Sequence, residues 1–156
     1  MADCFQSLAD ALRRETERYR ELTALAEEQK KILVSGRVDG LTENVRKQEK
    51  ILFTLGPLAE ERQRFLQDSG RQLGLEKASV TEVATRCPGD EGPLLKAAVK
   101  DLVETVQVLD EMGRTNGKLL ENAQGYAKFT LEALQGKTSV KPDAPVPNAG
   151  LFNRVV

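Results

Sequence analysis

The sequence contains no histidine and no tryptophan among its 156 residues, and aromatic residues make up only 4% of it. Without histidine, the commonest general acid–base side chain and the commonest transition-metal ligand are both missing. The Glu-x-x-His pairs of di-iron helical bundles are therefore excluded. The sequence also lacks GxGxxG, GxxxxGK[ST] and GxSxG spacings, so no motif predicts a nucleotide loop or a nucleophile elbow. We expect no catalytic residue, no cofactor and no metal, and a protein that is not an enzyme.

Cysteine, net charge and long apolar runs are also scarce. Cys4 and Cys87 stand in no metal or redox spacing, which favours free thiols in a reducing compartment. In the turn-rich loop after residue 86 we favour Cys87 as an inert apolar residue over a redox switch. The net charge is −1, and no segment is long and apolar enough for a signal peptide or a membrane span. These features predict a cytoplasmic protein with no nucleic-acid partner and no direct membrane insertion.

The abundant residues are Leu, Ala, Glu, Lys and Arg, which favour long helices. Asp3 is a good N-cap for a first helix that ends at Ser35, before Gly36. A second helix is predicted from Leu41, capped by Asp39, to about Leu73. Its apolar stripe keeps its phase across Pro57, so we expect a kink there in preference to a break. Arg62 also falls on this stripe, and we expect its stem to pack while its charge reaches the edge.

The helical period is lost after residue 73. Ser79 and Glu82 have the spacing of a capping box, which predicts a short helix to about Arg86. A third long helix is predicted from Pro93 or Leu94 to Gln135, roughly 40 residues and about 60 Å. The predicted fold is all-α: an antiparallel three-helix bundle of long, coiled-coil-like helices over residues 1–136, with the short helix in its second connection. Residues 137–156 contain three prolines and are predicted to form an extended or disordered tail.

The end of the third helix has two neighbouring apolar lines at helical spacing. The first consists of Leu120, Ala123, Ala127, Leu131 and Leu134, and the second, here called the apolar flank, consists of Leu119, Tyr126, Phe129 and Ala133. One line is enough to pack a surface helix onto its core, so the apolar flank needs an extra helix or a partner protein.

Small residues precede the two lines. Gly113 and Asn116 lie on the seam where larger apolar residues are expected. We favour a role in helix register and close approach, and the alternative is a hinge formed by Gly113, Asn116 and Gly117. In the tail, Leu151 and Phe152 are apolar enough to dock in a groove of the bundle, of a neighbour or of a partner, and the alternative is an unstructured end.

The chain resembles the FlgN-type flagellar export chaperones over about residues 3–136. Three pieces carry the resemblance: Ile32-Leu33-Val34-Ser35-Gly36-Arg37-Val38-Asp39-Gly40-Leu41; Gln48-Glu49-Lys50-Ile51-Leu52 and Leu58-Ala59-Glu60-Glu61-Arg62 with Leu73-Gly74-Leu75; and Asn116-x-x-Leu119-Leu120 continuing through Tyr126, Phe129 and Leu134 to Gly136. Each piece alone is weak, because coiled coils imitate one another. Their order, spacing and total length make the match. Pro57 and the segment from Leu151 onward depart from the pattern.

The resemblance implies a non-enzymatic cytoplasmic chaperone of the flagellar type III export apparatus. Its partners would be the C-terminal segments of hook–filament junction proteins and a component of the export gate. The surface that the family uses near its last helix maps onto Leu119, Leu120, Tyr126 and Phe129, with Ala133 beside them. Two alternatives stay open: a coiled-coil adaptor that forms a homo-oligomer, and an enzyme using carboxylates, which would need two or more acids on buried stripes.

Overall fold

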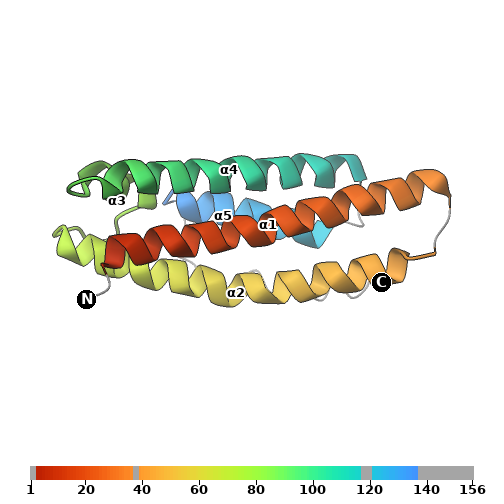
Figure 1. The fold of residues 1–156 in the computed structure, drawn as a ribbon, viewed down its shortest axis with the longest axis horizontal. Coiled ribbons are helices and arrows are strands. Elements are labelled where there is room, and N and C mark those ends of the chain that lie inside the picture. Colours follow the sequence, from red (N-terminus) through yellow and green to blue (C-terminus); the bar gives the residue numbers. More distant parts are fainter. Residues whose placement is uncertain (1–2, 37–38, 117–120, 137–156) are drawn as a thin grey trace.

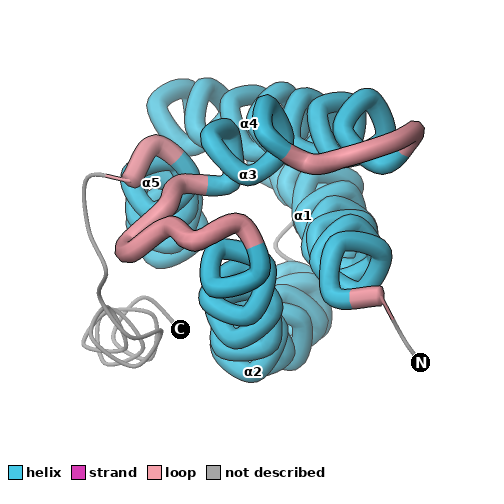
Figure 2. The backbone as a smooth tube through the Cα atoms, turned by 90° about the vertical axis from the view of Figure 1, so that its left-hand side faces the viewer, coloured by secondary structure: helices cyan, strands magenta, loops and turns pink. Residues whose placement is uncertain are grey.

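The computed structural model describes residues 3–36, 39–116 and 121–136. These ranges contain five α-helices and no strand, so the all-α prediction is confirmed. The long helices lie side by side along one axis (Figure 1). Viewed along that axis, the long helices surround a common centre (Figure 2). The helices are α1 (Cys4–Ser35), α2 (Leu41–Gln72), α3 (Val80–Arg86), α4 (Glu91–Asn116) and α5 (Glu121–Leu134).

Helix α1 begins and ends where the sequence predicts. The carboxylate of Asp3 accepts a hydrogen bond of 3.0 Å from the backbone N–H of Phe5, which satisfies one of the free donors of the first turn. Gly36 closes the helix in the left-handed conformation, at φ 73°, which costs glycine little. The buried face of α1 supplies the centre of the core, with large apolar side chains at helical spacing: Phe5, Leu8, Leu12, Tyr19 and Leu22.

Helix α2 is continuous through Pro57. Leu52, Leu55 and Leu66 are buried in one core on both sides of the proline, and this burial offsets the hydrogen bond that proline removes. The predicted cap is wrong: Gly40, at φ 87°, is the N-cap and offers no side chain, while Asp39 lies one position earlier. Helices α1 and α2 run in opposite directions, because side-chain pairs advance along α1 as they retreat along α2, from Glu15–Arg62 to Gln29–Gln48.

The prediction of a third helix reaching Gln135 is wrong. Helix α4 ends at Asn116, and α5 begins at Glu121, lies against α4 and runs back along it (Figure 1). Helices α1 and α2 have 32 residues each, which is about 48 Å at 1.5 Å per residue. An uninterrupted helix of roughly 60 Å would carry its last apolar turns past the ends of α1 and α2. Folding back instead buries Ala127 and Leu134 inside the bundle.

The short helix α3 closes one end of the bundle and confirms the predicted capping box. Ser79 Oγ accepts from the backbone N–H of Glu82 at 3.1 Å, and Glu82 accepts from the backbone N–H of Ser79 at 3.4 Å. Buried Val80, Val83 and Ala84 pack α3 onto α4. Gly92 permits this approach, because a Cβ there would lie 2.9 Å from the carbonyl oxygen of Ala84.

Candidate functional site: the cavity between α2 and α5

Helix α5 buries the first of its two apolar lines. Ala127 and Leu134 are buried, and Leu131 packs against the core. One polar contact joins this face to α1: the hydroxyl groups of Tyr19 and Thr130 lie 2.5 Å apart and are both buried. Helix α5 packs mainly against α4 and much less against α2. The side of α5 that faces α2 therefore has few packing contacts with that helix.

The described part of the apolar flank lies on the less buried side of α5. Phe129 and Ala133 are half-buried and stand one turn apart, at i and i+4, so they share a face of the helix. Tyr126 belongs to α5, but its side chain lies outside the described residues, as do Leu119 and Leu120. The packed helices therefore do not fully cover the described part of the flank: Phe129 and Ala133 remain partly exposed, and Ala133 lies opposite α2.

A cavity of about 750 Å³ separates the end of α5 from the end of α2, here called the α2–α5 cavity. Its volume falls in the range of ordinary ligand and peptide sites. Apolar and polar residues both line it, so the cavity suits a segment that brings both apolar groups and hydrogen-bonding backbone. Its lining is Gln63, Leu66, Gln67, Gly70 and Arg71 of α2, Leu75, Glu76, Lys77, Ala78 and Ser79 of the connection, and Ala133 and Gly136.

Backbone hydrogen bonds hold the wall formed by the α2–α3 connection. The N–H of Leu75 donates to the carbonyl of Gly70 at 2.8 Å, and the N–H of Gly74 donates to the carbonyl of Arg71 at 3.0 Å. With Gly74 at φ 71°, these two bonds form a Schellman motif. On the opposite wall Gly136, at φ 74°, lies close to Ser79: a Cβ added there would be 3.3 Å from the Ser79 Cβ.

Only part of this site could be found from the sequence. The pattern nominated the flank on α5, and Ala133 does line the cavity. The pattern did not predict the opposite wall, which consists of Gln63, Gln67 and Arg71 of α2 and the connection after α2. Gly70 was a usable signal of this wall. A glycine on the buried face of a helix marks a place where another segment comes close. Here that segment is the connection, because a Cβ added to Gly70 would lie 3.4 Å from the Leu75 carbonyl oxygen.

The other nominated residues fall at the edges of the described chain. Gly113 is buried within α4, Asn116 is the last residue of α4, and Gly117 lies outside the described residues. The helix thus ends inside the segment nominated as a hinge. Leu151 and Phe152 lie outside the described residues.

The other side of α2 holds a buried ion pair that the sequence pattern placed wrongly. Arg62 does not reach the edge: its side chain is 4% exposed, and its Nη1 donates to both carboxylate oxygens of Glu15, at 2.8 and 2.7 Å. Burial raises the pKa of Glu15, and the charge and hydrogen bonds of Arg62 lower it in part. The pair leaves no second buried carboxylate beside Glu15 among the described residues, so it offers no acid–base dyad.

A separate buried amide cluster lies further along the α1–α2 interface. Gln48 donates to Gln29 at 3.1 Å and to Asn44 at 2.7 Å, and Asn44 donates to the carbonyl of Leu25 at 2.9 Å. Within the described part of the chain, Gln29 Nε2 and Gln48 Oε1 are buried with no hydrogen-bond partner. These groups fix the register of α1 against α2, because a shift of either helix would leave more of them unpaired.

Cys87 shows no sign of a reactive thiolate. Burial, followed by the nearby Glu91 carboxylate, raises the pKa of its thiol to about 11, so the thiol is protonated at neutral pH. Among the described residues, no group of His, Cys, Asp and Glu side chains is arranged to hold a metal ion.

Comparison with known families assigns the chain to a family. The family model described as FlgN protein matches residues 1–142. The chain belongs to the FlgN family. No curated protein and no solved structure gave a significant match. The match includes α1 to α5 and hence both walls of the α2–α5 cavity.

Membership of the FlgN family assigns a general role. FlgN proteins are chaperones of flagellar export and not a family of enzymes. None of the described helices combines the length and the apolar content needed to cross a membrane.

Proposed function

We propose that this protein is a cytoplasmic type III export chaperone that binds the C-terminal segments of hook–filament junction proteins before their secretion and delivers them to the export gate. The observation that carries the proposal is the FlgN family match over residues 1–142. The client segment lies along the apolar flank of α5 and enters the α2–α5 cavity.

The shape and chemistry of the cavity support this binding mode. An amphipathic client helix presents apolar side chains at i, i+3, i+4 and i+7, and Phe129 with Ala133 offers an apolar strip of the same spacing. Gln63, Gln67 and Arg71 on the facing wall can satisfy polar groups at the edge of the client helix. Burying the strip also removes an exposed apolar surface from water.

The experiment that tests the proposal is alanine substitution of Leu119, Tyr126 and Phe129 together. We expect at least a tenfold weaker Kd for a peptide of the junction protein's C-terminal segment, measured by isothermal titration calorimetry, with unchanged helical circular dichroism. Aromatic anchors at the centre of an interface commonly contribute more than the 1.4 kcal/mol that a tenfold change requires.

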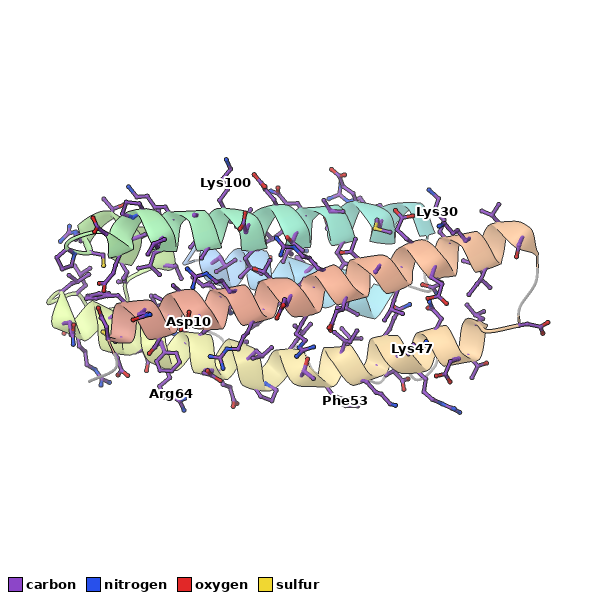
Figure 3. The ribbon with its side chains drawn as sticks, viewed as in Figure 1. Asp10, Lys30, Lys47, Phe53, Arg64 and Lys100 are labelled. Atoms are coloured by element: carbon purple, nitrogen blue, oxygen red, sulfur yellow. The ribbon has the colours of Figure 1, made fainter. Side chains whose placement is uncertain are left out.

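Phe53 provides the matched control. It is an aromatic residue on α2 that points away from the bundle (Figure 3) and is 73% exposed. Phe53→Ala should leave the Kd unchanged, whereas Phe129→Ala alone should weaken binding. Equal affinity of the triple variant and the unsubstituted chain would reject the flank as the client surface. Sedimentation showing an obligate oligomer that covers the flank would favour the coiled-coil adaptor instead.

A further inference from the structure

We infer that the tail of this chain, residues 137–156, occupies the α2–α5 cavity when no client is bound and competes with the client for it. This inference rests on the proposed function for the identity of the competitor, and on the structure for the place of docking.

The tail departs from the cavity itself. Gly136, the last described residue, lines the cavity and sits beside Ser79 on its opposite wall. A segment tethered there reaches an effective concentration of about 1 mM at the cavity. An intrinsic dissociation constant of about 0.1 mM would then give about 90% occupancy, so a weak fit is enough.

The length of the tail suffices for its apolar residues to turn back into the cavity. Residues 137–150 contain Pro142, Pro145 and Pro147, and they span up to about 43 Å at the 3.1 Å per residue of a polyproline helix. Helix α5, with 14 residues, is about 21 Å long at 1.5 Å per residue. Leu151 and Phe152 can therefore lie anywhere along the flank as well as in the cavity.

The lining matches such a segment in chemistry. Leu66, Leu75 and Ala78 offer apolar contacts for a Leu-Phe pair. Gln63 and Gln67 carry the donors and acceptors that an extended backbone needs. The occupant with both properties that is already present at this site is the chain's own tail.

Amide hydrogen exchange of the full-length chain, without client, tests the docking. In a Leu151→Asp/Phe152→Asp variant we expect at least fivefold faster exchange in residues 73–79 and 131–136, because their cover is lost. The matched control is Val140→Asp, an apolar-to-acid change near the base of the tail, which should leave exchange unchanged. Identical exchange in all three proteins would overturn the inference.

A substitution in the wall gives an independent check. Gln67 is exposed and lines the cavity, so Gln67→Trp fills the cavity without touching the core. It should expel the tail, and adding Leu151→Asp/Phe152→Asp to it should have no further effect on exchange in residues 131–136. If the tail substitutions still accelerated exchange fivefold in the Gln67→Trp background, the tail would dock outside the cavity.

Client titration then tests the competition. If the tail holds the cavity at the occupancy given above, Leu151→Asp/Phe152→Asp should tighten the client Kd about tenfold. If the variant showed faster amide exchange but an unchanged client Kd, the tail would dock without competing with the client. Absence of client binding in every protein, with the exchange result intact, would instead count against the proposed function and leave the docking of the tail in place.

Discussion

The two sides of α2 are built differently. Toward α1, two of its buried polar side chains make hydrogen bonds across the interface: Arg62 with Glu15, and Gln48 with Gln29. Toward α5, few contacts form, and a cavity of about 750 Å³ remains between the two helices. The closed side contains a charge pair that is nearly inaccessible to water, and the open side contains glutamines that water still reaches.

This difference separates what specifies the fold from what is free to bind. Buried polar pairs add little net stability but penalise every arrangement that leaves them unpaired. The α1–α2 hairpin is therefore fixed in register and serves as a rigid wall. Helix α5 is held by its packing on α4 and by the Tyr19–Thr130 contact, so the opposite wall depends on fewer interactions.

Breaking the ion pair on the closed side should have the largest effect on stability. Arg62→Leu leaves the Glu15 carboxylate buried without its partner, and we expect the free energy of unfolding to fall by about 3–5 kcal/mol in urea denaturation. The Glu15→Leu/Arg62→Leu double variant should recover most of this loss, because it buries no charge. A double variant as unstable as the single one would mean that packing volume, and not the charge, sets the cost.

The stability of the Arg62→Leu variant should acquire a distinctive pH dependence. Without Arg62 the pKa of Glu15 in the folded chain rises further above its ordinary value of 4.5, because the two effects that lower it are gone. The folded chain then holds a proton that the unfolded chain has lost, so stability falls as pH rises above 4.5, by up to about 1.4 kcal/mol per pH unit. Urea titrations of Arg62→Leu between pH 5 and 7 should show this slope. The Glu15→Leu/Arg62→Leu variant, which lacks the titrating group, should not.

A smaller effect is expected at the contact that ties α5 to α1. Tyr19→Phe removes the hydroxyl group 2.5 Å from that of Thr130 while keeping the ring in the core, and should cost about 1 kcal/mol. A double-mutant cycle with Thr130→Val measures the coupling, and hydrogen exchange should show α5 opening more readily than α2. A coupling energy of zero would mean that α5 is held by its apolar face alone.

The sequence predicted helix ends better than it predicted the arrangement of the helices. Asp3, Gly36 and Ser79 act locally, so their residue types were enough to place three helix ends. The break after Asn116 depends on the lengths of α1 and α2, which limit how far a third helix can remain packed. That is a property of the assembled bundle. The apolar stripe kept its helical phase across the break, so periodicity alone predicted one helix where there are two.

The buried ion pair could be predicted only by considering residues of two helices together. Arg62 falls on the apolar stripe of α2, and Glu15 stands three residues after Leu12 and four before Tyr19, on the buried face of α1. Opposite charges on two facing stripes predict a pair. Considered alone, Arg62 is expected to pack its stem and extend its charge into solvent. The α2 wall of the cavity could not be predicted for a related reason. Its prediction requires knowing where α5 packs, and therefore which side of α2 remains uncovered.

The smallest change in stability should come from the open side. Ala133 is half-buried and lines the cavity, so the added atoms of Ala133→Leu project away from the packed core, and the free energy of unfolding should change by no more than about 0.5 kcal/mol. The same substitution should weaken client binding at least tenfold by filling the site. Lys128→Leu, at an exposed position of the same helix, is the matched control and should leave binding intact. If Ala133→Leu destabilised the chain as strongly as a core substitution, α5 would be packed as tightly on this side as α1 is on the other, and the contrast between the two faces of α2 would fail.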